Sequence, residues 1–124
     1  MISMSHKEFY ELSIWKNGYT LLMSVYDCIE VFPYKERFAL ADQLCRSANS
    51  IIANIAESSG RYSYADKVRV LYISRGEISE TRSHLSVALG RKYISKETFS
   101  KLNDVYKQLI KELNLYINTL SKYK

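Results

Sequence analysis

Apolar residues recur every three or four positions along most of the chain, which is the spacing of amphipathic α-helices. Proline occurs once and glycine four times, so few residues would interrupt long helices. On this basis helices are predicted over residues 12–31, 35–59, 63–90 and 96–122. The connections between them are short, and short connections make neighbouring helices antiparallel. The predicted fold is therefore all-α, an up-down-up-down antiparallel four-helix bundle that forms one domain over residues 1–124.

Local signals place the ends of these helices. Pro33 disfavours helix in the residue before it and suits the start of the second helix. Gly60 is a suitable end for that helix. Ser63 with Asp66 three residues later resembles a capping box, and the fourth helix is expected to start after Ser95.

Each predicted helix has one apolar seam that would face the core. The seams are Leu12, Trp15, Tyr19, Leu22, Tyr26 and Ile29; Phe38, Ala41, Leu44 or Cys45, Ala48, Ile51 or Ile52 and Ile55; Val68, Leu71, Ile78, Leu85 and Leu89; and Phe99, Leu102, Tyr106, Leu109, Leu113, Tyr116 or Ile117 and Leu120. Gly76 lies inside the third helix, where it is explained either by the close approach of another helix or by simple tolerance.

Two arginines, Arg75 and Arg82, interrupt the third seam. If they are buried they need partners, for which Glu57, Glu77 or Glu80 are candidates. If the seam is partly open, they are free to meet phosphate instead. The sequence leaves both interpretations open.

The second helix also carries a polar stripe opposite its apolar seam. At a rotation of about 100° per residue around the helix axis, all residues of this stripe lie within about 80° of Arg46. They are Arg46, Ser50, Asn54, Glu57 and Arg61. A partner, a symmetry mate or a ligand would act on such a stripe, since folding alone does not require it.

The net charge is +5, and it is concentrated in the second half of the chain. Residues 61–124 contain 13 Lys/Arg and 6 Asp/Glu, whereas residues 1–60 contain 5 and 7. This asymmetry favours an anionic partner such as RNA or DNA, although an ordinary solvated basic surface would have the same composition. The candidate contacts are Arg61, Lys67, Arg69, Arg75, Arg82, Arg91 and Lys92.

Catalytic and metal chemistry find little support in the sequence. Histidine occurs only as His6 and His84, whereas a di-metal bundle needs two Glu-x-x-His pairs and two further carboxylates. Nucleophile and phosphate-binding motifs are also missing, so no catalytic residue, metal or cofactor is predicted. Cys28 and Cys45 are predicted to be buried free thiols. With no signal-peptide pattern and no apolar run long enough for a membrane span, a cytoplasmic protein is expected.

Tyr62 and Tyr64 flank the turn between the second and third helices. Aromatic side chains beside arginines can stack on unpaired bases, and they also anchor protein interfaces. Apolar residues outside the third seam (Val70, Ile73 and Val87) point to contact with neighbouring subunits, because a lone bundle needs one apolar stripe per helix.

The central motifs resemble the 23S rRNA-intervening sequence protein family. They are Phe32-Pro33 with Glu36, Gln43-Leu44-Cys45-Arg46, Ser50-Ile51, Asn54-Ile55-Ala56-Glu57 and Gly60-Arg61, within a resemblance over residues 9 to 120. The chain departs from the family pattern at Ser58, where the family usually has glycine, and at Glu77 after Gly76, where it usually has serine.

The resemblance implies a bacterial four-helix bundle that assembles as a ring-like homopentamer. A related protein, the accessory variability determinant of diversity-generating retroelements, is a basic pentamer that binds nucleic acid and a reverse transcriptase. The leading expectation is an oligomer that binds structured RNA or DNA, and the rival is a scaffold for a protein partner. A polar network or oligomer interface is expected from Arg46, Ser50, Asn54, Glu57, Glu80, Tyr62 and Tyr64.

Overall fold

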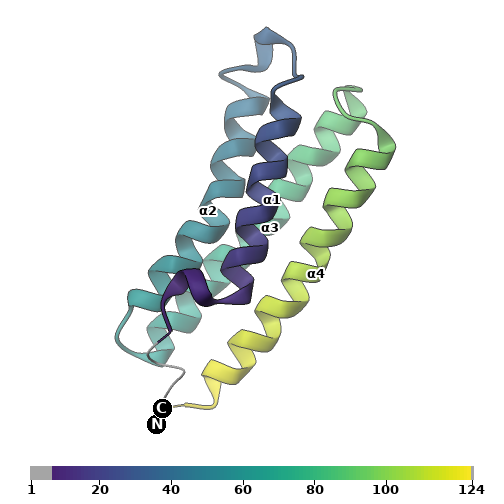
Figure 1. The fold of residues 1–124 in the computed structure, drawn as a ribbon. Helices are drawn as coiled ribbons and strands as arrows, with labels where there is room; N and C mark the ends of the chain where they lie inside the picture. The colour runs from purple at the N-terminus through teal and green to yellow at the C-terminus, as the bar shows by residue number, and fades with distance from the viewer. Residues whose placement is uncertain (1–6, 124) are drawn as a thin grey trace.

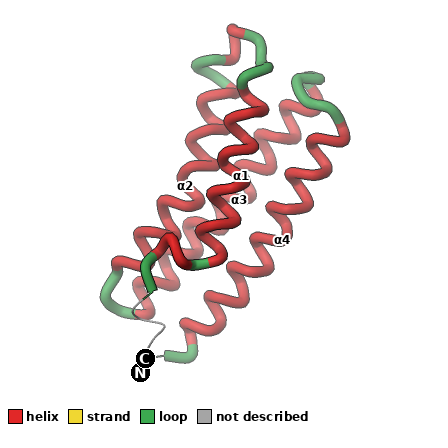
Figure 2. The backbone as a smooth tube through the Cα atoms, in the orientation of Figure 1, coloured by secondary structure: helices red, strands yellow, loops and turns green. Residues whose placement is uncertain are grey.

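The computed structural model describes residues 7–123, and within this range the chain forms four long helices and no strand. They are α1 (Ser13–Ile29), α2 (Leu40–Gly60), α3 (Tyr64–Gly90) and α4 (Lys96–Ser121). Two 3-10 turns, η2 (Phe9–Glu11) and η3 (Tyr34–Glu36), precede α1 and α2. Consecutive helices run in opposite directions and only short loops join them (Figures 1 and 2). The predicted all-α four-helix bundle is confirmed.

The starts of α3 and α4 lie where the capping residues predicted them. The Ser63 hydroxyl accepts a hydrogen bond from the Asp66 backbone N–H at 3.1 Å. The Ser95 hydroxyl accepts one from the Thr98 N–H at 3.0 Å. Each bond satisfies a backbone donor that has no partner within its own helix, which fixes the first turn.

The predicted start of the second helix at residue 35 is wrong. Residues 34–36 form only the turn η3, and α2 begins at Leu40. Ala39 has φ −125° and ψ −106°, so the backbone leaves the helical region just before α2. Phe38, assigned to the core seam, is 82% exposed.

The predicted seam of the first helix is correct only in part: Leu12 and Leu22 are buried and Trp15 and Ile29 pack against the core, but its two tyrosines do not. Ile14, Leu21 and Val25 are buried on the core side of α1, whereas Tyr19 and Tyr26 are exposed. The aromatic spacing placed Tyr19 and Tyr26 inward, whereas the tightest position on α1 is a residue without a side chain, Gly18.

The seams of α3 and α4 are confirmed at their central positions. Leu71, Ile78 and Leu85 of α3 are fully buried. On α4, burial follows the predicted spacing at Leu102, Tyr106, Leu109, Leu113, Ile117 and Leu120. These residues meet Leu44, Ala48, Ile51 and Ile55 of α2 in one continuous core.

Small polar side chains join α2 to α3, the most closely packed pair of helices. The Ser74 hydroxyl donates to the Ile51 carbonyl at 2.8 Å, and the Ser47 and Thr81 hydroxyls lie 2.8 Å apart. All three hydroxyl-bearing residues are buried. The bonds satisfy polar groups that would otherwise be costly in the core.

Replacing Thr81 by valine is expected to lower the free energy of unfolding by about 1–2 kcal/mol, because the Ser47 hydroxyl loses a buried partner. Thr119→Val is the matched control, since that hydroxyl donates to a backbone carbonyl at an exposed site. Urea unfolding of both variants measures the difference. Equal effects at the two sites would show that the Ser47–Thr81 contact adds no stability.

Tyr106 is a buried residue of α4 whose hydroxyl has no hydrogen-bond partner among the described residues. Burial raises its pKa, so the group stays neutral. Tyr106→Phe is expected to raise the free energy of unfolding by about 1 kcal/mol, because it removes an unsatisfied polar atom. Tyr93→Phe should do the opposite, since the Tyr93 hydroxyl donates to Glu36 at 2.8 Å. Thermal unfolding compares the two variants, and a less stable Tyr106→Phe protein would contradict the assignment.

The glycine that a neighbouring helix approaches is Gly18, not Gly76. A Cβ atom added at Gly18 would lie 2.5 Å from the Ile52 Cγ2 of α2. A Cβ atom at Gly76 would meet nothing within 4 Å, so close helix approach does not explain Gly76.

Candidate nucleic-acid interface

Two arginines of α3 are held by asparagines of α4. The Arg75 Nη1 donates to the Asn114 Oδ1 at 2.7 Å. The Arg82 Nε donates to the Asn103 Oδ1 at 2.8 Å. Both contacts are partly buried. The carboxylate partners considered for these arginines are wrong, because neither arginine forms a salt bridge within residues 7–123.

An amide partner has a different electrostatic consequence from a carboxylate. The amide oxygen accepts the hydrogen bond and fixes the guanidinium, but it carries no full charge to cancel the positive charge. Arg75 is held further by Tyr72, whose ring centroid lies 4.7 Å from the guanidinium carbon. Both arginines are thus oriented and remain net cations, which is the arrangement that phosphate binding requires.

Exposed lysines of α4 lie beside the same two asparagines. Lys107 follows Asn103 by one turn and Lys111 precedes Asn114 by three residues, so they share that side of α4. Neither lysine forms a salt bridge among the described residues. We call this surface the arginine–asparagine strip. Its members are Arg75, Arg82, Asn103, Lys107, Lys111 and Asn114.

Three other predicted contacts lie near the turn between α2 and α3, where they already have partners. Arg61 pairs with Glu57, and the Arg69 Nε lies 3.6 Å from an Asp66 carboxylate oxygen. The Lys67 ammonium donates to the backbone carbonyls at the end of α2, of residues 58 and 59, at 3.4 and 3.0 Å. Partial burial lowers the Lys67 pKa. Lys67 thus ties the start of α3 to the end of α2, whereas Arg61 and Arg69 are paired within their own helix turns.

The last two predicted contacts lie at the opposite end of α3. Arg91 lies over the Tyr93 ring at 5.9 Å, beside the carboxylate of Glu36 that accepts the Tyr93 hydroxyl. Lys92 follows in a left-handed conformation, with φ 65°. Arg91 is 16 residues from Arg75, or about 24 Å along a helix. The seven predicted residues therefore form three separate groups rather than one patch.

The polar stripe of α2 forms local pairs within one chain. The Asn54 side-chain amide donates to the Ser50 hydroxyl at 3.0 Å and to the Ser50 carbonyl at 2.8 Å. The Glu57–Arg61 pair stands apart from these bonds, and Arg46 is exposed. On α3, Glu80 contacts His84 rather than α2, at 3.2 Å. No continuous network joins these groups inside the described part of the subunit, and their role between subunits stays a prediction.

The two tyrosines at the α2–α3 turn have different surroundings. Tyr62 is fully exposed. Tyr64 is half-buried, and its ring stacks on Tyr123 near the end of the chain with centroids 4.9 Å apart. Only Tyr62 is free to contact a partner with its whole ring.

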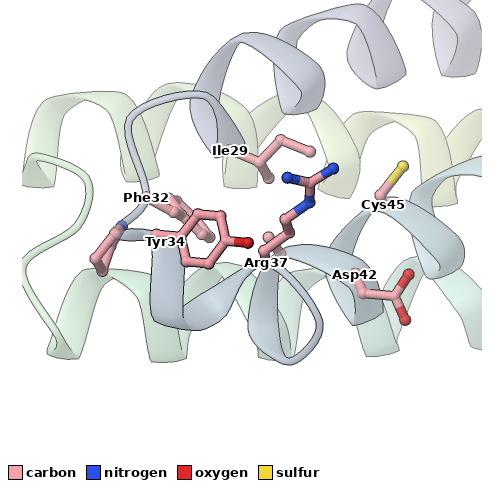
Figure 3. A pocket seen from close by; sticks show the side chains of 8 residues that line it. Ile29, Phe32, Tyr34, Arg37, Asp42 and Cys45 are labelled. Carbon is pink, nitrogen blue, oxygen red and sulfur yellow. The ribbon is translucent and has the colours of Figure 1, made fainter.

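An apolar groove lies between the end of α1 and the start of α2 (Figure 3). Its volume is about 360 Å³, and Arg37 extends across it toward Ile29. Other lining residues are Phe32, Pro33, Tyr34, Ala41, Asp42 and Cys45. The aromatic residues around the single proline were the available signal for this groove, but Pro33 was used only to place helix ends and Phe38 was assigned to the core seam.

Neither cysteine is fully buried, contrary to the prediction. Cys28 and Cys45 are half-buried free thiols. Burial and the nearby Asp27 carboxylate raise the pKa of Cys28, which keeps it protonated and unreactive at neutral pH.

Within residues 7–123 no three His, Cys, Asp or Glu side chains gather into a possible metal site. His6 lies outside the described residues. In the same range, no helix has the length and apolar character needed to span a membrane.

Comparison with known proteins gives a family and a structural neighbour. Residues 10–115 match the family model described as 23S rRNA-intervening sequence protein. The fold is similar to the 1.70 Å crystal structure of a protein of unknown function from the S23 ribosomal protein family of Bacteroides thetaiotaomicron. The TM-score is 0.77 at 25% sequence identity, over 84% of this chain and 97% of the neighbour. No curated protein matches.

Proposed function

This chain belongs to the 23S rRNA-intervening sequence protein family, and we propose that it is a non-catalytic, oligomeric bundle that binds structured RNA. The observation that carries the proposal is the pair of arginines, Arg75 and Arg82, whose positions are fixed by neutral amides. If these arginines served only to form structural ion pairs, their partners would be carboxylates. Amide partners leave two oriented positive charges for an anionic ligand.

The arginine–asparagine strip suits the nucleic-acid backbone. Arg75 and Arg82 are two turns apart, or about 10 Å along α3. Lys107 and Lys111 add two mobile charges on α4 beside them. Contacts of this kind bind phosphate, and they carry little sequence information.

Self-association is the second part of the proposal. Of the three apolar residues predicted to face neighbouring subunits, Val70 is buried within the subunit, whereas Ile73 and Val87 are exposed on α3. They lie two heptads apart, with Glu80 midway between them on the same side. Two exposed apolar side chains on one side of a helix suit a contact between copies, and a pentamer is the assembly that we propose. Light scattering coupled to size-exclusion chromatography tests this, and a monomeric mass at micromolar concentration would refute it.

Binding is tested by titrating the protein into labelled structured RNA and into duplex DNA at several salt concentrations. We expect sub-micromolar binding to RNA at low salt. If the four cations of one strip engage four phosphates, the logarithm of affinity falls with the logarithm of salt with a slope of about −3 to −4 per strip. Absence of binding at low salt would refute the proposal. If the protein binds duplex DNA more strongly than RNA, the proposed ligand is DNA and not RNA.

A further inference from the structure

The connection between α1 and α2 combines exposed apolar side chains with an excess of acidic charge. We call residues 27–42 the hairpin tip. Val31, Tyr34 and Phe38 of this segment are 70%, 77% and 82% exposed. Exposed aromatic residues in such a group mark an interaction surface more often than a solvated loop.

The groove beside these residues provides a place for an anchoring side chain. Its volume is about 360 Å³, and its walls come from the last turn of α1, the connection and the first turns of α2. Ile29 and Cys45 face it from opposite helices in Figure 3. A large apolar side chain from a partner would be enclosed there on several sides, which is typical of a binding hot spot.

The charges of the hairpin tip indicate what kind of partner fits. The segment contains four acidic residues, namely Asp27, Glu30, Glu36 and Asp42, and two basic ones, namely Lys35 and Arg37. No acidic residue of the tip forms a salt bridge within the described part of the chain. The Arg37 guanidinium lies over the Tyr34 and Phe38 rings, at 5.8 and 5.4 Å from their centroids.

Glu36 shows that part of this acidity is permanent. Its carboxylate accepts hydrogen bonds from the Tyr93 hydroxyl at 2.8 Å and from the Leu40 N–H at 3.3 Å. These bonds lower its pKa, so it remains ionised even in mildly acidic solution. Arg91 lies beside Glu36 and offsets part of this charge, but four acidic residues still face three basic ones. A lysine- or arginine-rich protein segment therefore fits the hairpin tip better than a phosphate backbone or an anionic lipid surface does.

We propose that the hairpin tip docks a cationic segment of a partner protein, which inserts a large apolar side chain into the groove between α1 and α2. This surface is separate from the arginine–asparagine strip, which lies on α3 and α4. One subunit can then hold nucleic acid and a basic protein at the same time, on two separate surfaces.

The test uses the full-length protein and a labelled synthetic amphipathic peptide with lysines on one helical face and leucines on the other. The same peptide with glutamate in place of each lysine is the charge control. Fluorescence anisotropy should show binding of the lysine peptide, and binding that is at least about tenfold weaker for the glutamate peptide. Absent or equal binding of the two peptides would overturn the proposal.

Three double variants locate the binding. Tyr34→Ser combined with Phe38→Ser should weaken binding of the lysine peptide by about tenfold or more, because the exposed aromatics are lost. Tyr10→Ser combined with Leu115→Ser removes exposed apolar residues elsewhere and should leave it unchanged. Glu30→Gln combined with Asp42→Asn should reduce both the affinity and its dependence on salt.

The same variants distinguish a partner protein from a second copy of this chain. Light scattering of the Tyr34→Ser, Phe38→Ser protein should give the mass of the unmodified oligomer. A smaller mass would mean that another subunit covers the hairpin tip, and it would overturn the proposal. Because the strip is intact in this variant, RNA binding should also be unchanged.

Discussion

Gly18→Ala is expected to lower the free energy of unfolding by about 1–3 kcal/mol, although alanine is the better helix former. The new Cβ atom would lie 2.5 Å from the Ile52 Cγ2, and Leu109 and Ile51 are next nearest at 3.8 and 3.9 Å. Ile52 is β-branched and buried, so its methyl group cannot rotate away without strain. Helices α1 and α2 would have to separate. Urea unfolding measured by circular dichroism gives the change.

Gly76→Ala is the matched control for this prediction. Its Cβ atom would enter open space on the exposed side of α3, so the same substitution should raise the free energy of unfolding by about 0.5–1 kcal/mol. An Ile52→Ala background removes the clashing methyl group, and there the cost of Gly18→Ala should largely disappear. If both glycine variants change stability in the same direction, the close approach at Gly18 is not the cause.

Arg75→Gln combined with Arg82→Gln is expected to weaken RNA binding by about tenfold to a hundredfold at low salt. It removes two of the four cations of the arginine–asparagine strip while keeping side chains of similar length. The slope of the logarithm of affinity against the logarithm of salt should become shallower by about 2. Filter binding or anisotropy over a salt series measures both quantities.

Two controls of charge accompany this variant. Arg37→Gln combined with Arg46→Gln makes the same change of net charge on α2 and the connection before it, and should have little effect on binding. Arg61→Ser, Arg69→Ser and Arg91→Ser together remove three arginines that already contact carboxylates or an aromatic ring. If this triple variant loses more affinity than the double variant does, the ends of α3 bind the nucleic acid and the strip does not.

The parts of the fold that were predicted correctly depend on residues close together in the sequence. Ser63 and Ser95 cap the helices that follow them, and each bond spans only three residues. The seam of α4 is regular, so its buried side was clear from spacing alone. The start of α2 failed because Phe38 continues the apolar period, although the backbone at Ala39 leaves the helical region. Periodicity does not detect a single residue with a different backbone conformation.

The two tyrosines of the α1 seam were assigned wrongly for a second reason. Hydrophobicity gives weight to large side chains, and Tyr19 and Tyr26 are large, but the closest packing occurs at Gly18. A search for apolar side chains does not detect a position where close packing requires glycine. The partner of that position, Ile52, is 34 residues away.

The candidate site was predicted only in part for the same physical reason. Arg75 and Arg82 were recognised as unusual, since charged residues in an apolar seam need partners. Their asparagine partners are 39 and 21 residues later, on a helix whose rotation about its axis was unknown. Glutamates nearer in the sequence were therefore considered first. A glutamate partner would cancel the positive charge of the arginine, whereas an asparagine partner retains it. Which partner is present depends on how α3 packs against α4.

The close pairing of α2 with α3 has a consequence for how the chain folds. Three residues connect these helices, and buried bonds such as that from Ser74 to Ile51 join them. Forming this hairpin closes a short loop, whereas joining α1 to α4 closes nearly the whole chain, as the bond from Asn17 to Glu112 does. We expect the α2–α3 hairpin to form early in refolding. Native-state hydrogen exchange should then find the slowest amides in α2 and α3, and the first local opening along the α1–α4 contact.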